Sequence, residues 1–310
     1  MTRAIPWLAV YGFGAHIKST QKKLTILNKG IVEEYPLSEI RNLLLVGGHN
    51  LNSATISHLL KNGSFISFFE ADGTPVGILK PFGESPDKKI QGLQENLPRY
   101  RYATALARAT LKSRLIAIES LQEQRGSTLL YEGELQILHN ALSNFDYLVK
   151  LDEIRRLSDL TRSMYYEILS RDLPKQWGFR RRTDRPPCDP VNAIFSFGYA
   201  MLFGNCGVSV IGAHLDPDLG LLHEGPGALV RDFIGPFKAT MIDPVVCRIV
   251  RDHLGSGDYD QTPSRCMLSD HVAQSLIVEF RKSIDNQKLD LQVNNFVQSL
   301  QKMEEFTVLC

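Results

Sequence analysis

Residues 186–251 read PPCDPVNAIFSFGYAMLFGNCGVSVIGAHLDPDLGLLHEGPGALVRDFIGPFKATMIDPVVCRIVR and hold most of the side chains that could form a site. Asp189 followed by Pro190 predicts a helix start, because the carboxylate can cap free amides and proline gives up an amide that has no partner there. Apolar residues then recur at spacings of three and four: Ile194, Phe197, Met201 and Leu202. This period predicts a helix with one face in the core.

A turn rich in histidine and aspartate follows this helix. Two histidines and three aspartates lie within nineteen positions: His214, Asp216, Asp218, His223 and Asp232. Residues 229–233 begin a second helical pattern, which places Asp232 on a helix. Further on, Asp243 precedes Pro244, and this order of carboxylate and proline predicts a second capped helix start.

The N-terminal region has the pattern of a β-rich domain. Short aromatic and β-branched runs alternate with turn residues at 7–11, 23–27, 31–35, 42–46 and 65–69. Residues 53–61 carry apolar side chains at helical spacing and end at Asn62-Gly63. We therefore expect a small sandwich-like β domain with one helix.

The period changes from strand to helix after a stretch rich in proline, glycine and charge. Residues 86–98 are predicted to link a domain at 1–85 to a larger all-α domain at 99–310. Helices are expected at about 99–124, 131–143 and 148–170. The predicted fold class is α+β, with the β-rich domain first.

Composition excludes several classes of protein. The 310 residues are 43% hydrophobic and 22% charged, which is typical of a globular protein, and the net charge of +1 does not mark a nucleic-acid binder by itself. The five cysteines form no CxxC pair, which argues against a zinc ribbon or a disulfide framework. No apolar run is expected to reach the roughly 20 residues that span a bilayer, and the N-terminus lacks a signal-peptide pattern, so we predict a cytoplasmic protein.

Positive charge is concentrated just before the Asp189 helix start. Five cations stand against one acid in residues 175–185: Lys175, Arg180, Arg181, Arg182 and Arg185. Trp177 and Phe179 are interleaved with them, and cations with stacking rings suit a DNA backbone and unpaired bases. The alternative interpretation is a solvated loop, and we favour DNA contact.

The chain resembles the universal CRISPR-associated integrase-nuclease family, the "Cas one" subunit that inserts spacers into CRISPR arrays. Three motifs carry the resemblance in order: DPVNAIFSFGYAML at 189–202, HLDPDLGLLHEG at 214–225 and LVRDFIGPFKATMIDPVV at 229–246. It extends upstream to LLLVGGHNLNSATISHLLKNGSFISFFEADGTPVG at 43–77 and downstream to CMLSDHVAQSLIVEFRK at 266–282. Three motifs with near-family spacing are a specific signal, and the likeness covers nearly the whole chain.

The resemblance implies a DNA-binding homodimer that pairs through its β-rich domain and works with the second CRISPR adaptation subunit. The family performs phosphodiester chemistry with Mn²⁺ or Mg²⁺, held by a glutamate, a histidine and a further acid. Such a metal activates the attacking hydroxyl and screens the phosphate.

Carrying the family's ligands across gives an incomplete set. His223 falls on the metal-binding histidine, and Asp232 on the first aspartate of a DxxE/D pattern. The second acid of that pattern falls on Gly235. The glutamate, eight residues before the second tyrosine of the pair at 165–166, falls on Ser158.

Nearby carboxylates are candidates to replace the missing ligands. Asp159 is one position from the expected glutamate, but one helical step is about 100° of rotation. Asp218 or Asp216 could close the site from the turn. We expect weak metal binding, with His223 and Asp232 as the catalytic and metal-binding pair.

Two functions therefore compete. One is an active DNA integrase or nuclease with rearranged ligands, and the other is a DNA-binding or structural homologue that has lost the chemistry. Ser158 and Gly235 favour the second function, whereas His223 keeps the first open.

Overall fold

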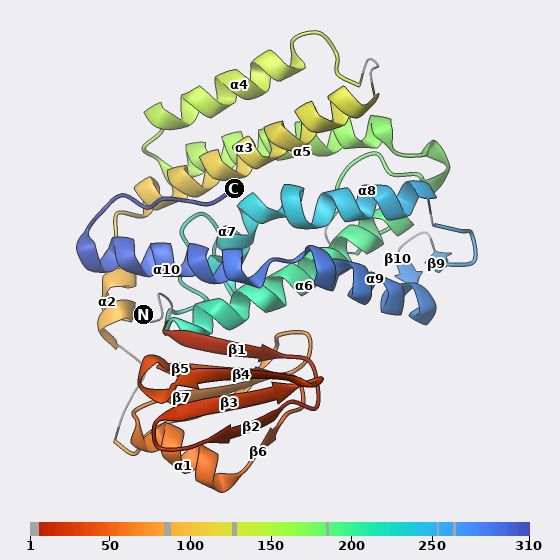
Figure 1. The fold of residues 1–310 in the computed structure, drawn as a ribbon. Coiled ribbons are helices and arrows are strands. Elements are labelled where there is room, and N and C mark those ends of the chain that lie inside the picture. Colours follow the sequence, from red (N-terminus) through yellow and green to blue (C-terminus); the bar gives the residue numbers. More distant parts are fainter. Residues whose placement is uncertain (1–5, 84–87, 126–128, 184–185, 253, 263–264) are drawn as a thin grey trace. The chain divides into compact units, whose positions relative to one another are not determined.

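The computed structural model describes residues 6–83, 88–125, 129–183, 186–252, 254–262 and 265–310 (Figure 1). The chain forms two compact units. The first is strand-rich and combines Met1–Leu97, Phe203–Leu219 and Asn286–Glu305. The second is mostly helical and combines Pro98–Leu202, Gly220–Asp285 and Phe306–Cys310. Two later segments of the chain therefore join the strand-rich unit, and helix α2 (Lys88–Glu95) occupies most of the predicted linker.

Eight strands of the first unit form two four-stranded sheets. They are β1 (Trp7–Tyr11), β2 (His16–Ser19), β3 (Lys23–Asn28), β4 (Ile31–Pro36), β5 (Asn42–Val46), β6 (Asn50–Leu51), β7 (Phe65–Phe69) and β8 (Pro75–Leu79). One sheet has the order β1-β5-β7-β8 and the other β4-β3-β2-β6. Strands β1, β5 and β7 run parallel, and β8 is antiparallel to β7.

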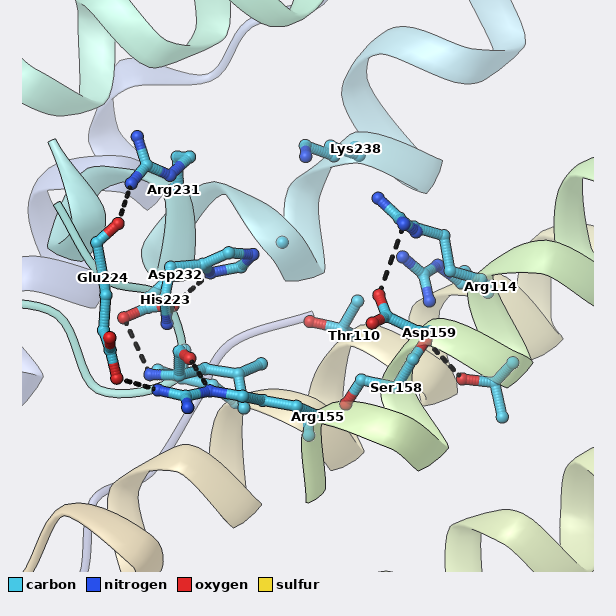
Figure 2. A pocket seen from close by; sticks show the side chains of 16 residues that line it. Thr110, Arg114, Arg155, Ser158, Asp159, His223, Glu224, Arg231, Asp232 and Lys238 are labelled. Carbon is cyan, nitrogen blue, oxygen red and sulfur yellow. Dashed lines mark hydrogen bonds and ion pairs between the residues drawn. The ribbon is translucent and has the colours of Figure 1, made fainter. Parts of the chain in front are cut away.

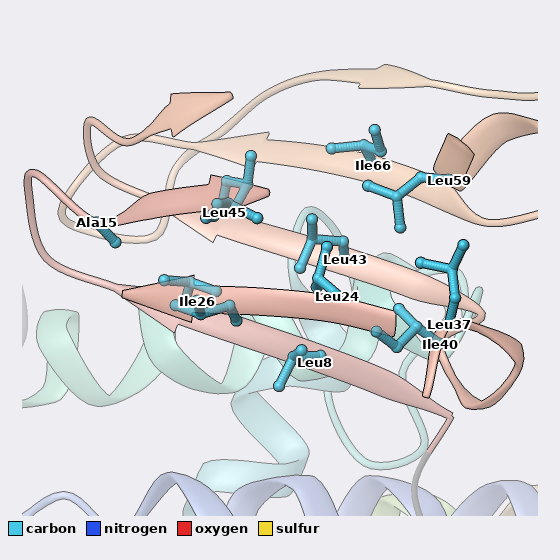
Figure 3. Close-up of a cluster of buried hydrophobic side chains, with 12 residues drawn as sticks. Leu8, Ala15, Leu24, Ile26, Leu37, Ile40, Leu43, Leu45, Leu59 and Ile66 are labelled. Carbon is cyan, nitrogen blue, oxygen red and sulfur yellow. The ribbon is translucent and has the colours of Figure 1, made fainter. Parts of the chain in front are cut away.

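Buried aliphatic side chains from both sheets form one core, seen in Figure 3. Leu8, Leu43 and Leu45 come from the first sheet, and Leu24 and Ile26 from the second. Helix α1 (Ser53–Lys61) adds Leu59 to this cluster. Alternate residues of each strand point to one face, so the period-two pattern builds this core.

Strand β5 is buried on both of its faces, which explains its unbroken apolar sequence NLLLV. Leu43 and Leu45 point into the aliphatic core, whereas Leu44 between them lies beside Gly212 at the end of helix α6 (Pro190–Gly212). Trp7 of β1 also borders Gly212, and its indole nitrogen donates a 2.6 Å hydrogen bond to Asp290 of helix α10 (Asn286–Lys302). These contacts attach the end of α6 and α10 to the first sheet.

The second unit is built from helices and one hairpin. Its elements are α3 (Arg99–Arg125), α4 (Glu134–Asn144), α5 (Leu151–Asp172), the first part of α6, α7 (Ala228–Phe237), the π-helical segment η4 (Lys238–Ile242), α8 (Asp243–Asp252), β9 (Tyr259–Thr262), β10 (Arg265–Leu268) and α9 (Asp270–Ser283). Three short 3-10 turns complete the described elements of the chain: Leu37–Glu39, Phe145–Tyr147 and Lys175–Trp177. The predicted fold class is confirmed, with the hairpin β9–β10 as an exception to the expected all-α region.

The two predicted aspartate caps have different outcomes. Asp189 accepts a 2.8 Å hydrogen bond from the amide of Asn192, and α6 begins at Pro190, so the first prediction is confirmed. The second is wrong. The carboxylate of Asp243 instead accepts hydrogen bonds from the hydroxyls of Tyr165 and Tyr199, because α8 continues directly from η4 and needs no cap.

Helix α6 also corrects the expectation that no stretch is long and apolar enough to cross a membrane. By length and composition it meets that test. Within the structure, however, 56% of its apolar window is buried against the protein. The composition of α6 is therefore also that of a core helix.

Candidate functional site

One pocket in the helical unit brings together the positions that correspond to the family's ligands (Figure 2). Ser158 and Asp159 come from α5, Asp232 and Gly235 from α7, and His223 from the loop before α7. Helix α3 and segment η4 supply the remaining walls. Two carboxylates were candidates to replace the missing metal ligands. Asp159 lines the pocket, whereas Asp218 is not among the described residues that line it.

Asp232 is fully committed to holding the loop before α7. Its side chain is 0% exposed. Its two oxygens accept the amides of Leu221, Leu222 and His223 at 2.5, 3.1 and 3.0 Å. They also contact Nδ1 of the His223 ring at 2.5 Å. A carboxylate offers about four acceptor positions, so Asp232 has little capacity left for a metal.

His223 presents its other ring nitrogen to the pocket. Because Nδ1 is paired with Asp232, the carboxylate favours a proton on Nδ1 and leaves Nε2 as the acceptor. The side chain is 49% exposed, so Nε2 can reach a ligand. His223 and Asp232, which are nine residues apart in the sequence, are in direct contact in the structure.

The two positions that lack a family acid are filled by other contacts. Ser158 donates a 2.8 Å hydrogen bond to the carbonyl of Ile154, one turn back on its own helix. A Cβ added to Gly235 would lie 2.7 Å from Oγ1 of Thr110 on α3. Thr110 therefore occupies the space into which an acid at 235 would project.

Asp159 does not replace the missing glutamate. Its carboxylate is 68% exposed and pairs with Arg162, one turn further along α5, at 3.3 Å. The rotation between neighbouring helical positions separates it from Ser158. Among the described residues, no group of three histidine, cysteine or carboxylate side chains is arranged to hold a metal ion. A divalent metal thus does not fit the residues present.

The pocket is instead rich in positive charge. Of the described residues that line it, five are cationic and three are carboxylates. Arg155 pairs with Glu224 at 2.7 Å and donates to the carbonyl of Leu222 at 2.7 Å. Arg231 donates to backbone carbonyls of the same loop. These two arginines shape the loop that carries His223.

Two further cations, Arg114 and Lys238, lie on the faces of tyrosine rings. Arg114 is 5.7 Å from the ring centre of Tyr165, and Lys238 is 4.8 Å from that of Tyr199. Both tyrosine hydroxyls donate to Asp243, at 2.8 and 2.5 Å. Burial raises the pKa of the Asp243 carboxyl to about 6, although these hydrogen bonds and the two cations oppose the rise.

The basic segment at 175–185 has a mixed structure. Trp177 and Phe179 are buried, with the indole donating to the carbonyl of Val250, so the prediction that these rings stack on bases is wrong. The guanidinium of Arg182 is directed inward, where it donates to Asn192 and Ser196 at 2.9 Å. The exposed cations that remain are Lys175, Arg180 and Arg181. Arg185 lies outside the described residues.

Comparison with known proteins identifies the class to which this fold and pocket belong. A profile of the family "CRISPR associated protein Cas1" matches residues 8–282. A CRISPR-associated Cas1 protein of Methanospirillum hungatei is 44% identical over 96% of this chain and 99% of its own length. The chain belongs to the Cas1 family, the integrase and endonuclease family of spacer acquisition.

Solved structures share the fold at low sequence identity. A casposase bound to an integration product aligns with TM-score 0.82 at 18% identity, covering 98% of both chains. A partial Cas6-RT-Cas1–Cas2 complex aligns with TM-score 0.81 at 19% identity, again over 98% of both. A Cas1–DNA complex aligns with TM-score 0.58 at 19% identity, over 95% of this chain and 96% of that one.

Sequence reasoning pointed to five positions of the pocket and gave no role to its other polar residues, among them Thr110, Arg114 and Lys238. Thr110 and Arg114 are four positions apart on one helix and therefore share a face. Lys238 follows Gly235 at the end of the DxxE/D segment. These spacings were a usable signal, but nothing in the sequence indicated which helix faced α7.

Proposed function

We propose that this chain is a DNA-binding homodimer of CRISPR spacer acquisition with little or no metal-dependent phosphodiester chemistry of its own. The proposal rests on the residues that stand at the family's metal-ligand positions. Ser158 and Gly235 provide no metal ligand, and Asp232 is occupied by three backbone amides and an imidazole. The scaffold is kept, while the residues for Mn²⁺ or Mg²⁺ are not.

Binding to DNA is supported by the exposed cations and by solved structures that share this fold. Lys175, Arg180 and Arg181 are exposed on one short segment and suit contacts to phosphates. Similar folds have been solved as a Cas1–DNA complex and as a Cas1–Cas2 assembly. We accordingly propose DNA and the second adaptation subunit as partners, acting in the cytoplasm.

Homodimerisation is proposed through the strand-rich unit. Strands β4 and β8 are edges of their sheets, and both expose apolar side chains. Ile31 and Val32 of β4 are 67% and 60% exposed, and Val76 of β8 is 63% exposed. Apolar edges of this kind are commonly covered by a partner copy. A sedimentation series that finds a monomer at every protein concentration would reject this part of the proposal.

The competing function is an active integrase or nuclease that uses substitute carboxylates. It requires Asp159 to leave Arg162 and turn toward His223, and it requires Asp232 to give up backbone amides. The second change breaks charge-assisted hydrogen bonds from backbone amides, each worth about 1.5–3 kcal/mol, whereas the exposed Asp159–Arg162 pair contributes at most about 1 kcal/mol. We therefore favour the inactive form.

A strand-transfer assay with manganese distinguishes the two functions. We expect wild-type turnover to be slow or absent and unaffected by His223→Ala. Restoring the acids requires room, so the rescue variant is Thr110→Ala with Ser158→Glu and Gly235→Asp, because Thr110 lies where the new side chain would project. This variant is expected to exceed wild type by at least about tenfold, as expected for a regained catalytic metal.

The matched control for the rescue variant keeps Thr110 and carries only the two acids. It should be less stable and less active, since the added Cβ meets Oγ1 of Thr110. Robust wild-type turnover that His223→Ala abolishes would show that substitute carboxylates serve, and the proposal would be wrong.

A further inference from the structure

Two cysteines of the helical unit meet just before helix α6. Cys188 directly precedes the capping residue Asp189, and Cys266 lies in strand β10. The backbone amide of Cys266 donates a 2.8 Å hydrogen bond to the carbonyl of Pro187, whose peptide bond leads to Cys188. Both cysteines are thiols in the structure. The hairpin β9–β10 therefore brings its cysteine to the chain segment that carries the other one.

The side chain of Cys266 lies on the face of the hairpin that contacts Cys188. Gln261 of β9 is the cross-strand partner of Cys266, and residues directly opposite in an antiparallel pair have their side chains on one face. The side-chain amide of Gln261 donates a 2.7 Å hydrogen bond to the carbonyl of Cys188. The Cys266 thiol is therefore directed to the same side as this contact.

The backbone hydrogen bond limits the distance between the two Cα atoms. The N–Cα bond of Cys266, the 2.8 Å hydrogen bond and the peptide unit from Pro187 to Cys188 together span at most about 7 Å. The usual angles at a hydrogen bond shorten this separation to about 5–6 Å. Disulfides have Cα separations of about 4.4–6.8 Å. The two sulfur atoms can therefore bond after side-chain rotation, without a large movement of the backbone.

The two thiols differ in their access to solvent. Cys188 is exposed, whereas Cys266 is 3% exposed. Burial is the main cause that raises the pKa of the Cys266 thiol to about 11, and the carboxylates of Asp189 and Asp260 add to the rise. The thiolate is the attacking species in disulfide exchange, and the attack requires access to the oxidant. Cys188 is thus the residue that a dissolved oxidant reaches first.

We propose that Cys188 and Cys266 form a thiol modification site, which small-molecule disulfides of the glutathione type convert reversibly into an intramolecular disulfide. The Cys188 thiolate attacks one sulfur of the small disulfide and forms a mixed disulfide, and the small thiolate that leaves takes up the proton lost by Cys188. Cys266 then loses its proton, attacks the Cys188 sulfur and displaces the second small thiol. Two cysteine thiols are oxidised and one small disulfide is reduced to two thiols. Excess small thiol reverses both steps.

The disulfide would tie the hairpin to the start of α6 and close a loop of residues 188–266. A closed loop restricts the unfolded chain, so oxidation should raise the thermal unfolding midpoint by about 5 °C. Reversible disulfides of this kind report on oxidants in compartments where structural disulfides are rare. Neither cysteine is among the described residues that line the pocket, so this site goes beyond the proposed function.

Incubation of the full chain with glutathione disulfide, followed by peptide mapping without reductant, tests the proposal. In the wild type we expect a cross-linked pair of peptides that contain Cys188 and Cys266, with little glutathione on Cys188 and full reversal by dithiothreitol. Cys266→Ala removes the second thiol and should raise the amount of glutathione held on Cys188 by at least about tenfold. Alanine keeps this buried position apolar, as a buried cysteine is.

Two further variants control the measurement. Cys188→Ser changes an exposed side chain and should abolish both the cross-link and the rise of the unfolding midpoint on oxidation. Cys310→Ser is the matched control, because Cys310 is also exposed. This control should leave the yield of the Cys188–Cys266 cross-link within about twofold of wild type.

Three outcomes would overturn the inference. Glutathione could remain on Cys188 in the wild type to the same extent as in Cys266→Ala. Both thiols could stay unchanged at every ratio of oxidised to reduced glutathione. Oxidation could instead join two chains through Cys188, which a gel without reductant would show. None of these results depends on DNA or metal binding, so the proposed function stands or falls separately.

Discussion

Individual residues explain why the pocket could be located from sequence while its chemistry could not. The family resemblance pointed to Ser158, His223, Asp232 and Gly235, and the structure gathers these positions at one pocket. That Asp232 serves the loop amides depends on the course of residues 221–223, which no spacing reveals. Packing between distant helices is likewise invisible in a single sequence.

The contact between Thr110 and Gly235 illustrates this limit. The two residues are far apart in sequence, on α3 and α7. From the sequence alone, Gly235 indicates only that the family's acid is absent. The structure adds that the space is filled, so the loss is accompanied by repacking. An acid returned to 235 would meet Thr110 unless that residue is also changed.

Asp243 makes stability depend on pH in a predictable direction. Burial raises its pKa to about 6 in the folded chain, against about 3.9 when unfolded. The folded state therefore binds the proton more tightly, and the free energy of unfolding should fall as pH rises from about 4 to about 6. The contribution of this carboxyl is up to about 3 kcal/mol.

Chemical denaturation of wild type and Asp243→Asn at several pH values measures this contribution. Asparagine has no proton to bind, so the difference in unfolding free energy between the two proteins should change between pH 4 and pH 6. These limits are about the pKa of Asp243 in the unfolded and in the folded chain. Other titrating groups cancel in the difference. Parallel pH profiles would show that Asp243 does not titrate in this range.

Elements with a strong period were the most predictable part of the fold. Strands β1, β3, β4, β5 and β7 and helices α1, α3, α4 and α5 lie within a few residues of the predicted ranges. The strand β2 (HIKS) was missed because its four residues include a single aliphatic side chain, and β8 (PVGIL) because it begins with proline, contains glycine and is exposed along its whole length. Helix α2 was taken for linker because its sequence is charged and follows several prolines and glycines.

The turn between β7 and β8 packs closely on helix α6 at two glycines. A Cβ added to Gly204 would lie 1.8 Å from the carbonyl oxygen of Asp72, and one added to Gly73 would meet the backbone of Gly204. Backbone atoms cannot turn aside as a side chain can. The variant Gly204→Ala should therefore lose about 3 kcal/mol of unfolding free energy.

Gly92→Ala is the matched control for this prediction. Gly92 lies in helix α2, where an added Cβ meets no atom within 4 Å. Alanine there should stabilise the chain by about 0.5–1 kcal/mol, since it removes the entropic cost of a helical glycine. Equal effects of the two substitutions in denaturant titrations would contradict close packing at Gly204.

At the level of the whole chain, the net charge of +1 gave no indication of the local excess of cations in the pocket. Charge is distributed locally, with five cations at one pocket and exposed cations at 175–181. The family resemblance could be recognised because three ordered motifs survive although two ligands do not. Function within the family depends on a few positions, whereas fold depends on many.

Titration calorimetry with MnCl₂ on the purified wild-type chain measures whether a metal site exists. We expect no saturable heat attributable to the pocket, and the same trace for His223→Ala, because His223 and an occupied Asp232 cannot hold the ion. Stoichiometric binding in the wild type that disappears in His223→Ala would contradict this account and restore the metal-dependent function.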